Sequence, residues 1–222
     1  MRLALFLQFT NSVRPMSKKK KTALRIAPEN WLDPFDFKAK FPHPEYPLEI
    51  DIGSGKGRFL VARSGKLPES NFLGIERLLG RIHSSGRRCE RAGRENVRMF
   101  RMEGYYAISQ MVPANYVANY YFFFPDPWPK ARHHDQRLFN PAFMDALFKT
   151  LEDGGNLHVA TDHLPYFEEI HELLQKDDRF TEIDAFEPND EERTDFELIF
   201  SHKQIGRCSF RKNGVGERGI RE

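Results

Sequence analysis

The sequence predicts one α/β domain built around a mostly parallel sheet. Short apolar segments alternate with longer, more polar ones along most of its 222 residues. This alternation is the pattern of successive strand–helix–strand units, which place strands side by side in parallel. The composition, 40% hydrophobic and 30% charged, is that of a folded soluble domain rather than a disordered chain. No internal repeat or low-complexity tract interrupts the pattern, and the length suits one domain.

The first half of the chain is expected to hold three strands, each followed by a helix. The apolar segments YPLEIDIG, NFLGIE and NVRMFRME are short enough for buried strands. The segments between them are longer and carry more charge, as helices on the face of a sheet do. We predict strands at 46–53, 71–76 and 96–103, and helices at 56–67, 77–93 and, shorter, 105–111.

The second half continues the alternation and then changes character. A fourth strand is expected at 116–124, before a proline-rich loop, and a fifth at 156–162. Helices are expected at 140–155, where two glycines close the helix, and at 164–177. The last segments, 180–187 and 194–210, have the composition of two longer strands that pair antiparallel.

The N-terminal region differs from the rest. We expect residues 1–35 to form a basic, flexible extension and residues 36–222 to form the domain. The first fifteen residues make a poor signal peptide, because Gln8 interrupts the apolar run and no cleavage site follows; a translation start at Met16 is an alternative. The run Lys18 to Lys21 is expected to be a solvated tail, with nonspecific attraction to RNA as the second interpretation.

Charge and cysteine usage narrow the class of protein. The net charge is only +2, so overall charge does not indicate nucleic acid, but eight arginines lie between Arg77 and Arg101. This cluster is either a solvated helix face or a local attraction for polyanions. Cys89 and Cys208 are too few for a disulfide framework and form no zinc-binding pair, which favours the reducing cytoplasm. No apolar run approaches the length of a membrane span.

An acidic residue stands at or just after the end of each predicted parallel strand. These residues are Asp51, Glu76, Glu103, Asp126 and Asp162. Right-handed crossovers bring the carboxyl ends of parallel strands to one edge of the sheet, so the acids should line one crevice. Any one of them has the alternative role of capping the helix that follows, but five in register favour a ligand site.

The first turn narrows the choice of ligand. Gly53, Gly55 and Gly57 lie between a strand and a helix, where the missing side chains let a ligand approach the backbone. A dinucleotide fingerprint needs glycine at position 58, where Arg58 stands, and a Walker loop is also missing. Glu76 can accept the ribose hydroxyls of NAD or of S-adenosylmethionine. The neighbouring carboxylates repel a pyrophosphate and attract a sulfonium, which favours S-adenosylmethionine.

An ordered series of motifs then resembles one family. EIDIGSGKGRF, FLGIE, NVRMFRMEG, FFFPDPWPKARHH, HVATD and TDFE together resemble the bacterial tRNA (guanine-N7-)-methyltransferases, over roughly Pro47 to Phe210. The resemblance implies a class I methyltransferase fold: a Rossmann-like, three-layer α/β domain with a seven-stranded, mostly parallel sheet and an antiparallel C-terminal strand. It implies methyl transfer from S-adenosylmethionine to N7 of guanosine 46 in the variable loop of tRNA.

The resemblance also implies roles for individual residues. It assigns cofactor binding to Asp51, Gly53, Gly55, Glu76, Glu103 and Asp126, with Asp126 also catalytic. It assigns substrate binding to Lys130, Asp162, Thr194, Asp195, Phe196 and Glu197, and RNA contact to Arg132, His133, His134 and Arg137. The chain departs from the usual pattern at Asp51, usually Glu, and at Glu103, usually Asp or Asn. It also carries Asp135 and Gln136 where Lys and Arg are usual, which weakens the expected phosphate contact.

The proline-rich loop suggests how such a site works. The two prolines beside Asp126 stiffen the loop, so it can hold a carboxylate, Trp128 and Lys130 beside a methyl donor. N7 of guanine has a free lone pair and needs no general base, so we expect alignment to dominate catalysis. We expect Asp126 to orient the cofactor or base, and Asp162 or Glu197 to accept from the guanine edge. For Trp128, stacking on the base and packing in the core are two equally weighted interpretations.

Other functions stay open at this point. One alternative is a class I methyltransferase acting on another RNA, a protein or a small molecule; the other is an RNA-binding protein without catalysis. The basic tract argues against a small-molecule substrate, and the intact acidic series argues against loss of catalysis. Adjacent His133 and His134 have no partner motif, so no metal is expected. The expected partner is tRNA and not a membrane, with the protein a monomer or a homodimer.

Overall fold

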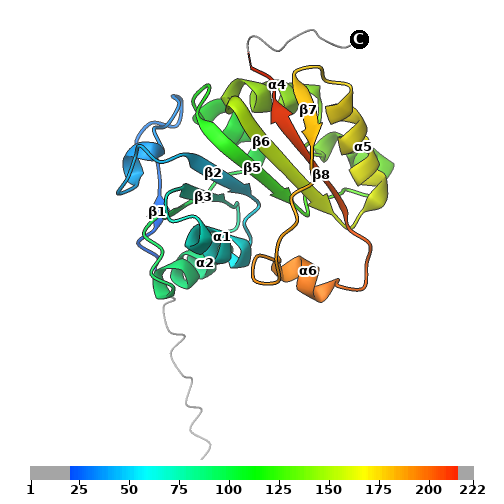
Figure 1. Ribbon diagram of the computed structural model, residues 1–222. Coiled ribbons are helices and arrows are strands. Elements are labelled where there is room, and N and C mark those ends of the chain that lie inside the picture. Colours follow the sequence, from blue (N-terminus) through cyan, green and yellow to red (C-terminus); the bar gives the residue numbers. More distant parts are fainter. Residues whose placement is uncertain (1–20, 215–222) are drawn as a thin grey trace, which may run out of the picture.

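A central sheet with helices on both faces organises the chain in the computed structural model, which describes residues 21–214 (Figure 1). The sheet has eight strands in the order β1-β4-β3-β2-β5-β6-β8-β7. Their bounds are β1 Arg25–Ile26, β2 Leu48–Ile52, β3 Asn71–Ile75, β4 Val97–Phe100, β5 Val117–Phe123, β6 Leu151–Thr161, β7 Phe180–Ile183 and β8 Gly206–Lys212. The pairings from β1 to β6 are parallel, whereas β8 runs antiparallel to both β6 and β7.

Among residues 21–214, all the α-helices except α6 lie where the sequence alternation places them. The α-helices are α1 Arg58–Lys66, α2 Leu79–Arg91, α3 Gly104–Tyr106, α4 Pro141–Thr150, α5 Leu164–Gln175 and α6 Asp195–Ile199. Three short segments have other helical geometry: η1 Lys38–Lys40 and η3 Ala131–Gln136 are 3-10 helices, and η2 Ala107–Met111 is a π-helix that continues α3. Within residues 21–214, no helix has the length and apolar character needed to cross a membrane.

Two apolar clusters, one on each face of the sheet, make the fold a three-layer structure. On one face, Leu60 of α1 and Ile82 of α2 pack with Phe72 and Val97. On the other face, a larger cluster joins the sheet to η2, α4 and α5 and includes the completely buried Ile50. Successive side chains of a strand point to opposite faces of the sheet. Each fully buried large apolar side chain stabilises the folded state by about 1.5–3 kcal/mol. Both faces are covered, which explains why β2 and β3 are buried along their whole length.

The predicted fold is confirmed, with three corrections of detail. The sheet has eight strands rather than seven, because Arg25–Ile26 pairs with β4; the folded region therefore begins inside the predicted extension 1–35. The remaining part of that extension, residues 1–20, lies outside the described residues. The helix predicted at 140–155 ends at Thr150, because Leu151 takes extended backbone angles and starts β6. Residues 195–199 form helix α6 rather than the start of a strand.

The position of a ligand site follows from the strand order. The chain runs outward from β2 to β3 and β4 in one direction, and from β5 to β6 in the other. Strand β2 therefore pairs with β3 on one side and with β5 on the other. In open parallel sheets a crevice forms at such a switch point, beyond the carboxyl ends of the strands. Here those ends belong to β2 and β5.

Candidate active site

The five acidic residues predicted to share one edge follow the carboxyl ends of successive parallel strands. Asp51 is the last residue but one of β2, and Glu76 comes directly after β3. Glu103, Asp126 and Asp162 follow β4, β5 and β6. Parallel strands carry these residues to the same edge of the sheet. The topology therefore supports the crevice expected from their spacing.

Asp51 and Glu76 form a buried acidic pair. Their residues are only 4% and 5% exposed. Burial, and then the charge of Glu76, raises the pKa of Asp51 from 3.8 to about 8. The negative charge of Glu76 is better compensated, because its carboxylate accepts the Leu78 N–H at 2.8 Å and lies 3.5 Å from Arg81 Nη1. With so few donors, ionisation of Asp51 is costly in the ligand-free protein, and a positively charged group bound beside the pair would favour its ionised form.

The three glycines of the turn beside this pair are needed for two different reasons. Gly53, Gly55 and Gly57 all have positive φ, which favours glycine. A side chain on Gly53 would extend into open space, whereas one on Gly57 would lie 2.0 Å from Ser85 Oγ of α2. Gly53 and Gly55 therefore leave room for a ligand, and Gly57 allows α1 and α2 to pack closely. Ser54 adds a buried hydroxyl oxygen with no hydrogen-bond partner among the described residues.

Glu103 has a local structural role at the same edge. It is the N-cap of α3, and its carboxylate accepts the N–H groups of Tyr105 and Tyr106, both at 2.9 Å. This is the capping alternative that the sequence left open. The residue is exposed and each oxygen keeps a lone pair, so a cofactor contact by Glu103 stays a prediction.

Asp126 lies on an exposed loop with unusual backbone geometry. Phe124 and Trp128, two residues away on either side, have φ values of 57° and 42°. Such values are uncommon outside glycine and persist where neighbouring contacts hold them. The Phe124 N–H donates to the Ala160 carbonyl at 2.7 Å, and Arg137 Nε donates to the Pro127 carbonyl at 2.8 Å. The loop is therefore held at both ends.

The Asp126 side chain itself is available. It is exposed, and within residues 21–214 it makes no hydrogen bond or ion pair with another side chain. Nearby, Trp128 is half-buried and its ring meets His133 edge-on at 5.8 Å. The surroundings thus hold the backbone of Asp126 while leaving its carboxylate free to contact a ligand.

The basic tract after this loop divides into an exposed part and a buried residue. Lys130, Arg132 and His134 are exposed, and Arg132 Nε lies 3.2 Å from His133 Nε2. Arg137 corrects our expectation of a surface RNA contact, because its residue is 7% exposed. Its guanidinium pairs with Glu169 and lies 4.8 Å above the Tyr166 ring, besides binding the Pro127 carbonyl. In this position Arg137 supports the loop rather than facing the solvent.

The segment 194–197 is a helix start. Thr194 is the N-cap of α6: its hydroxyl accepts the Glu197 N–H at 3.2 Å, and Glu197 accepts the Thr194 N–H at 2.7 Å. This reciprocal pair is a capping box. The second oxygen of Glu197 is paired with Arg207, and the residue is 4% exposed. Glu197 therefore has its acceptors engaged inside the protein, whereas Asp195 lies 3.7 Å from Arg88 of α2.

Phe196 and Asp162 differ in exposure and in their partners. Phe196 is 46% exposed and stacks on Phe124 with ring centroids 5.9 Å apart, next to the Asp126 loop. Asp162 is half-buried and pairs with Lys203.

Sequence reasoning missed Phe124, Lys203 and Arg207, because each acts through a partner far away in the chain. Ser54 could have been found from its place between two glycines.

These features define a class I methyltransferase fold with a cofactor crevice. The family model described as "Putative methyltransferase" matches residues 45–204. A tRNA (guanine-N(7)-)-methyltransferase of Salmonella choleraesuis is 35% identical over 168 residues, 72% of this chain and 68% of the relative. The chain belongs to the family of these tRNA (guanine-N(7)-)-methyltransferases, as the motif series implied.

Further relatives carry the same description. The enzyme of Idiomarina loihiensis is 36% identical over 64% of this chain and 58% of the relative. That of Nocardia farcinica is 39% identical over 66% and 54%. The chain thus spans a little over half the length of these two curated relatives.

Solved structures support the fold. A 16S rRNA (adenine(1408)-N(1))-methyltransferase from Catenulisporales acidiphilia, solved with cosubstrate SAM, has a TM-score of 0.53 at 12% identity, covering 81% of this chain and 90% of that one. An rRNA methylase from Streptococcus thermophilus has a TM-score of 0.51 at 14% identity, covering 76% and 88%. At such identities the likeness concerns the fold.

The site residues fit S-adenosylmethionine. Gly53 and Gly55 leave open backbone, Ser54 offers an unpartnered hydroxyl, and Asp51 and Glu76 offer carboxylates for a cation and for ribose hydroxyls. A metal has no comparable set of ligands: across residues 21–214, no group of three or more His, Cys, Asp or Glu side chains is placed to hold one.

Proposed function

We propose that the protein transfers a methyl group from S-adenosylmethionine to N7 of a guanosine in tRNA, and that this is guanosine 46 of the variable loop. The family match carries the proposal, because residues 45–204 include every residue predicted to contact cofactor or tRNA. The acidic crevice at the β2–β5 switch point supports it independently. The expected place of action is the cytoplasm, where tRNA substrates are found.

Cofactor binding is assigned to the β2–α1 turn and the acids beside it. When bound, S-adenosylmethionine supplies a methyl group activated by a positively charged sulfur. Asp51 stabilises the positive charge of the ligand, and Glu76 accepts from the ribose hydroxyls. Gly53 and Gly55 let the ligand approach the backbone, with Ser54 as a further hydrogen-bonding group.

Positioning of the base is assigned to the loop after β5 and to α6. N7 of guanine attacks with its own lone pair, so the protein has no proton to remove and contributes mainly alignment. Asp126 orients the reacting partners, and its free carboxylate suits this role. The exposed ring of Phe196, backed by Phe124, offers a face on which an unstacked base can lie. Asp162 is the better acceptor for the guanine edge, because Lys203 engages one of its oxygens, whereas Thr194 and Arg207 engage both oxygens of Glu197.

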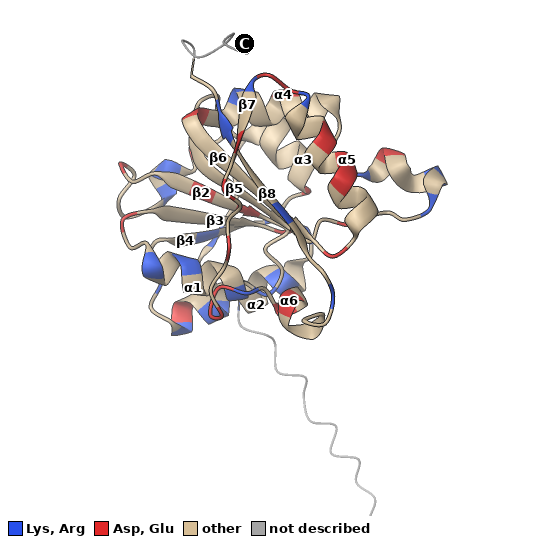
Figure 2. Cartoon of the chain, turned by 45° about the vertical axis from the view of Figure 1, so that its right-hand side comes forward, with Lys and Arg blue, Asp and Glu red and all other residues tan. Residues whose placement is uncertain are grey.

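Contact with the RNA backbone is assigned to exposed cations. Lys130 and Arg132 extend from the loop and η3, with His133 and His134 beside them. Lys and Arg positions also lie along α1 and α2 (Figure 2), next to α6. Phosphate contacts of this kind fix the register of an RNA without reading its sequence.

The decisive experiment uses labelled S-adenosylmethionine and unmodified tRNA transcripts with and without guanosine at position 46. The expected result is incorporation that vanishes without this guanosine and maps to N7. Incorporation that persists would move the target within the RNA. If no RNA is methylated, S-adenosylhomocysteine separates the alternatives: a methyltransferase with another substrate is stabilised against thermal unfolding, and an RNA-binding protein without catalysis is not.

A further inference from the structure

A stretch of chain between β7 and α6 crosses one face of the sheet and ends at the segment proposed to contact RNA. We call residues 184–194 the strap. Figure 1 shows it descending from β7 to α6, in front of the sheet and beside α1. It ends at Thr194, the N-cap of α6, so the position of the strap sets the position of the segment Thr194–Glu197.

The first anchor of the strap is Phe186. Its ring lies 5.7 Å from Tyr121 and 5.3 Å from His158, both on the sheet. Its N–H donates to Ser209 Oγ at 2.9 Å, and the same hydroxyl lies 2.7 Å from His158 Nδ1. The beginning of the strap is therefore held by both packing and a hydrogen bond.

The second anchor is Glu192. It is 2% exposed, although it is a carboxylate on a connecting segment. Its Oε2 lies 2.9 Å from Lys66 Nζ, and its Oε1 lies 3.3 Å from Arg63 Nη1. Burial alone would raise the pKa of Glu192, but the hydrogen bonds from Lys66 and Asn189 and the charge of Arg63 lower it overall. A buried carboxylate with two cationic partners favours one geometry and disfavours any that separates them.

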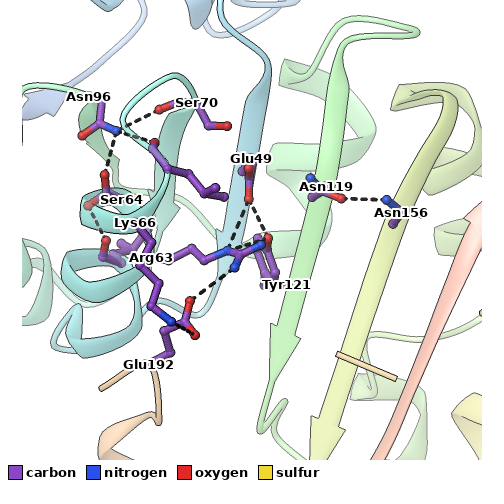
Figure 3. A network of polar contacts seen from close by, with 12 residues as sticks. Glu49, Arg63, Ser64, Lys66, Ser70, Asn96, Asn119, Tyr121, Asn156 and Glu192 are labelled. Carbon is purple, nitrogen blue, oxygen red and sulfur yellow. Dashed lines mark hydrogen bonds and ion pairs between the residues drawn. The ribbon is translucent and has the colours of Figure 1, made fainter. Parts of the chain in front are cut away.

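Arg63 joins the two anchors. Its guanidinium lies 4.9 Å from the centre of the Phe186 ring. The same group pairs with Glu192 (Figure 3). The same side chain donates from Nε to the Tyr121 hydroxyl at 3.3 Å, and Nε lies 3.9 Å from Glu49 Oε2. One arginine of α1 thus contacts the strap at both ends and the sheet between them.

Helix α1 is itself firmly placed. Asn96 Nδ2 donates to the carbonyls of Ser64 and Ser70 at 3.1 and 2.9 Å, which holds the end of α1 and the following loop (Figure 3). At its other end, α1 begins at Arg58, directly after the glycine turn. Arg58 Nε donates to the Arg193 carbonyl at 2.8 Å, a third link to the strap.

We propose that Arg63 and Glu192 are positioning residues that set the place of α6, and hence of the RNA, relative to the cofactor turn. The strap is tied to the helix that leaves this turn, so the two binding regions share one support. The inference rests on the proposed function. Neither residue is expected to touch cofactor or base; both act through the strap on Thr194–Glu197.

The test compares Glu192→Gln, Arg63→Met and the double variant with Glu191→Gln as matched control. Glu191 is the neighbouring carboxylate and is exposed. The measurements are kcat and KM for tRNA, the Kd for S-adenosylhomocysteine, and hydrogen exchange of residues 186–199 against β5. We expect Glu192→Gln to raise KM for tRNA about tenfold and to speed exchange in the strap and α6, with cofactor affinity within about twofold of the parent.

Two results decide whether the proposal stands: how far the effects of the two substitutions overlap, and whether faster hydrogen exchange stays within the strap and α6. The double variant should lose less than the sum of the two single variants, because either substitution alone already removes the Arg63–Glu192 contact. Parent-like exchange and KM in Glu192→Gln would overturn the proposal. Faster exchange throughout β5 with loss of cofactor binding would also overturn it, since that is general destabilisation. The exchange readout needs no methyl transfer: if the parent fails to methylate tRNA while the variant still releases the strap and α6, the proposed function falls and the anchoring stands.

Discussion

Two parts of the molecule present acidic residues to the same crevice but hold them in opposite ways. In the part proposed to bind the cofactor (the cofactor part, residues 48–103), Asp51 and Glu76 are buried within a regular frame of strands and a glycine turn. In the part proposed to contact RNA (the RNA part, residues 124–140 and 184–205), Asp126 is exposed on a loop whose Pro127 carbonyl accepts a hydrogen bond from Arg137. The first part depends on local backbone geometry, and the second on side-chain pairs between distant segments. Substitutions in the second should therefore alter activity with little loss of fold.

The largest effect is expected from Asp126→Ala. The carboxylate is exposed and unpartnered within residues 21–214, so its removal should leave the free energy of unfolding within about 0.5 kcal/mol of the parent. Loss of alignment should lower kcat about 100-fold or more. Single-turnover methylation of tRNA together with thermal unfolding measures both quantities.

Asp135→Ala is the matched control for that variant. Asp135 is another exposed acid, in η3 of the same part. It should keep at least the turnover of the parent, because loss of a negative charge in the basic tract does not weaken phosphate contact. Near-parent turnover in Asp126→Ala would remove the proposed role of this carboxylate, whatever the control does.

The contrast between the parts also explains what the sequence could predict. In the cofactor part, strand, turn and acid are neighbours in the chain, so periodicity and a few glycines were enough to place Asp51 and Glu76. In the RNA part, a local pattern misled: the segment TDFELIF has strand-like composition, but the capping box of Thr194 and Glu197 starts a helix. Arg137 looked like one more basic residue, and its buried pairing with Glu169 cannot be read from spacing.

The second prediction concerns the pH dependence of cofactor binding. Burial and the charge of Glu76 raise the pKa of Asp51 to about 8, so the ligand-free protein holds a proton there at neutral pH. The α-ammonium group of the ligand favours the ionised form of Asp51, so binding must displace that proton. The affinity for S-adenosylhomocysteine should therefore rise with pH up to about 8, by at most about tenfold per pH unit. Titration calorimetry from pH 6 to 9 measures this slope, and Asp51→Asn should flatten it.

The ligand-free protein gives an independent measure with the opposite sign. Because the pKa of Asp51 is raised on folding, its contribution to stability is fully present below its unfolded value of 3.8 and is lost as pH rises through about 8. As the pH rises from 4 to 8, the free energy of unfolding of the parent should therefore fall relative to that of Asp51→Asn. Parallel stability curves for the two proteins would argue against a protonated Asp51.

A smaller effect separates the two kinds of basic residue in the RNA part. Arg132→Ala removes an exposed charge, so it should weaken tRNA binding and lower the salt slope by about 0.7–0.9 without changing stability. Arg137→Ala removes a buried donor to Glu169 and to the Pro127 carbonyl, and should cost about 1–3 kcal/mol of stability. Binding at several salt concentrations, with denaturant unfolding of both variants, distinguishes them. Equal stability losses would contradict the division.

The smallest expected effect is a gain. Asp135 and Gln136 lie in η3 and are exposed, close in the chain to the exposed cations Lys130 and Arg132. The double substitution Asp135→Lys and Gln136→Arg should tighten tRNA binding a few-fold and steepen its salt dependence, because each new cation adds at most one phosphate contact. Cofactor affinity should stay unchanged, since the cofactor part does not depend on these side chains. A gain for tRNA that is matched by an equal gain for an unrelated RNA would show that η3 adds only nonspecific attraction, and that recognition lies with α6 and the Asp126 loop.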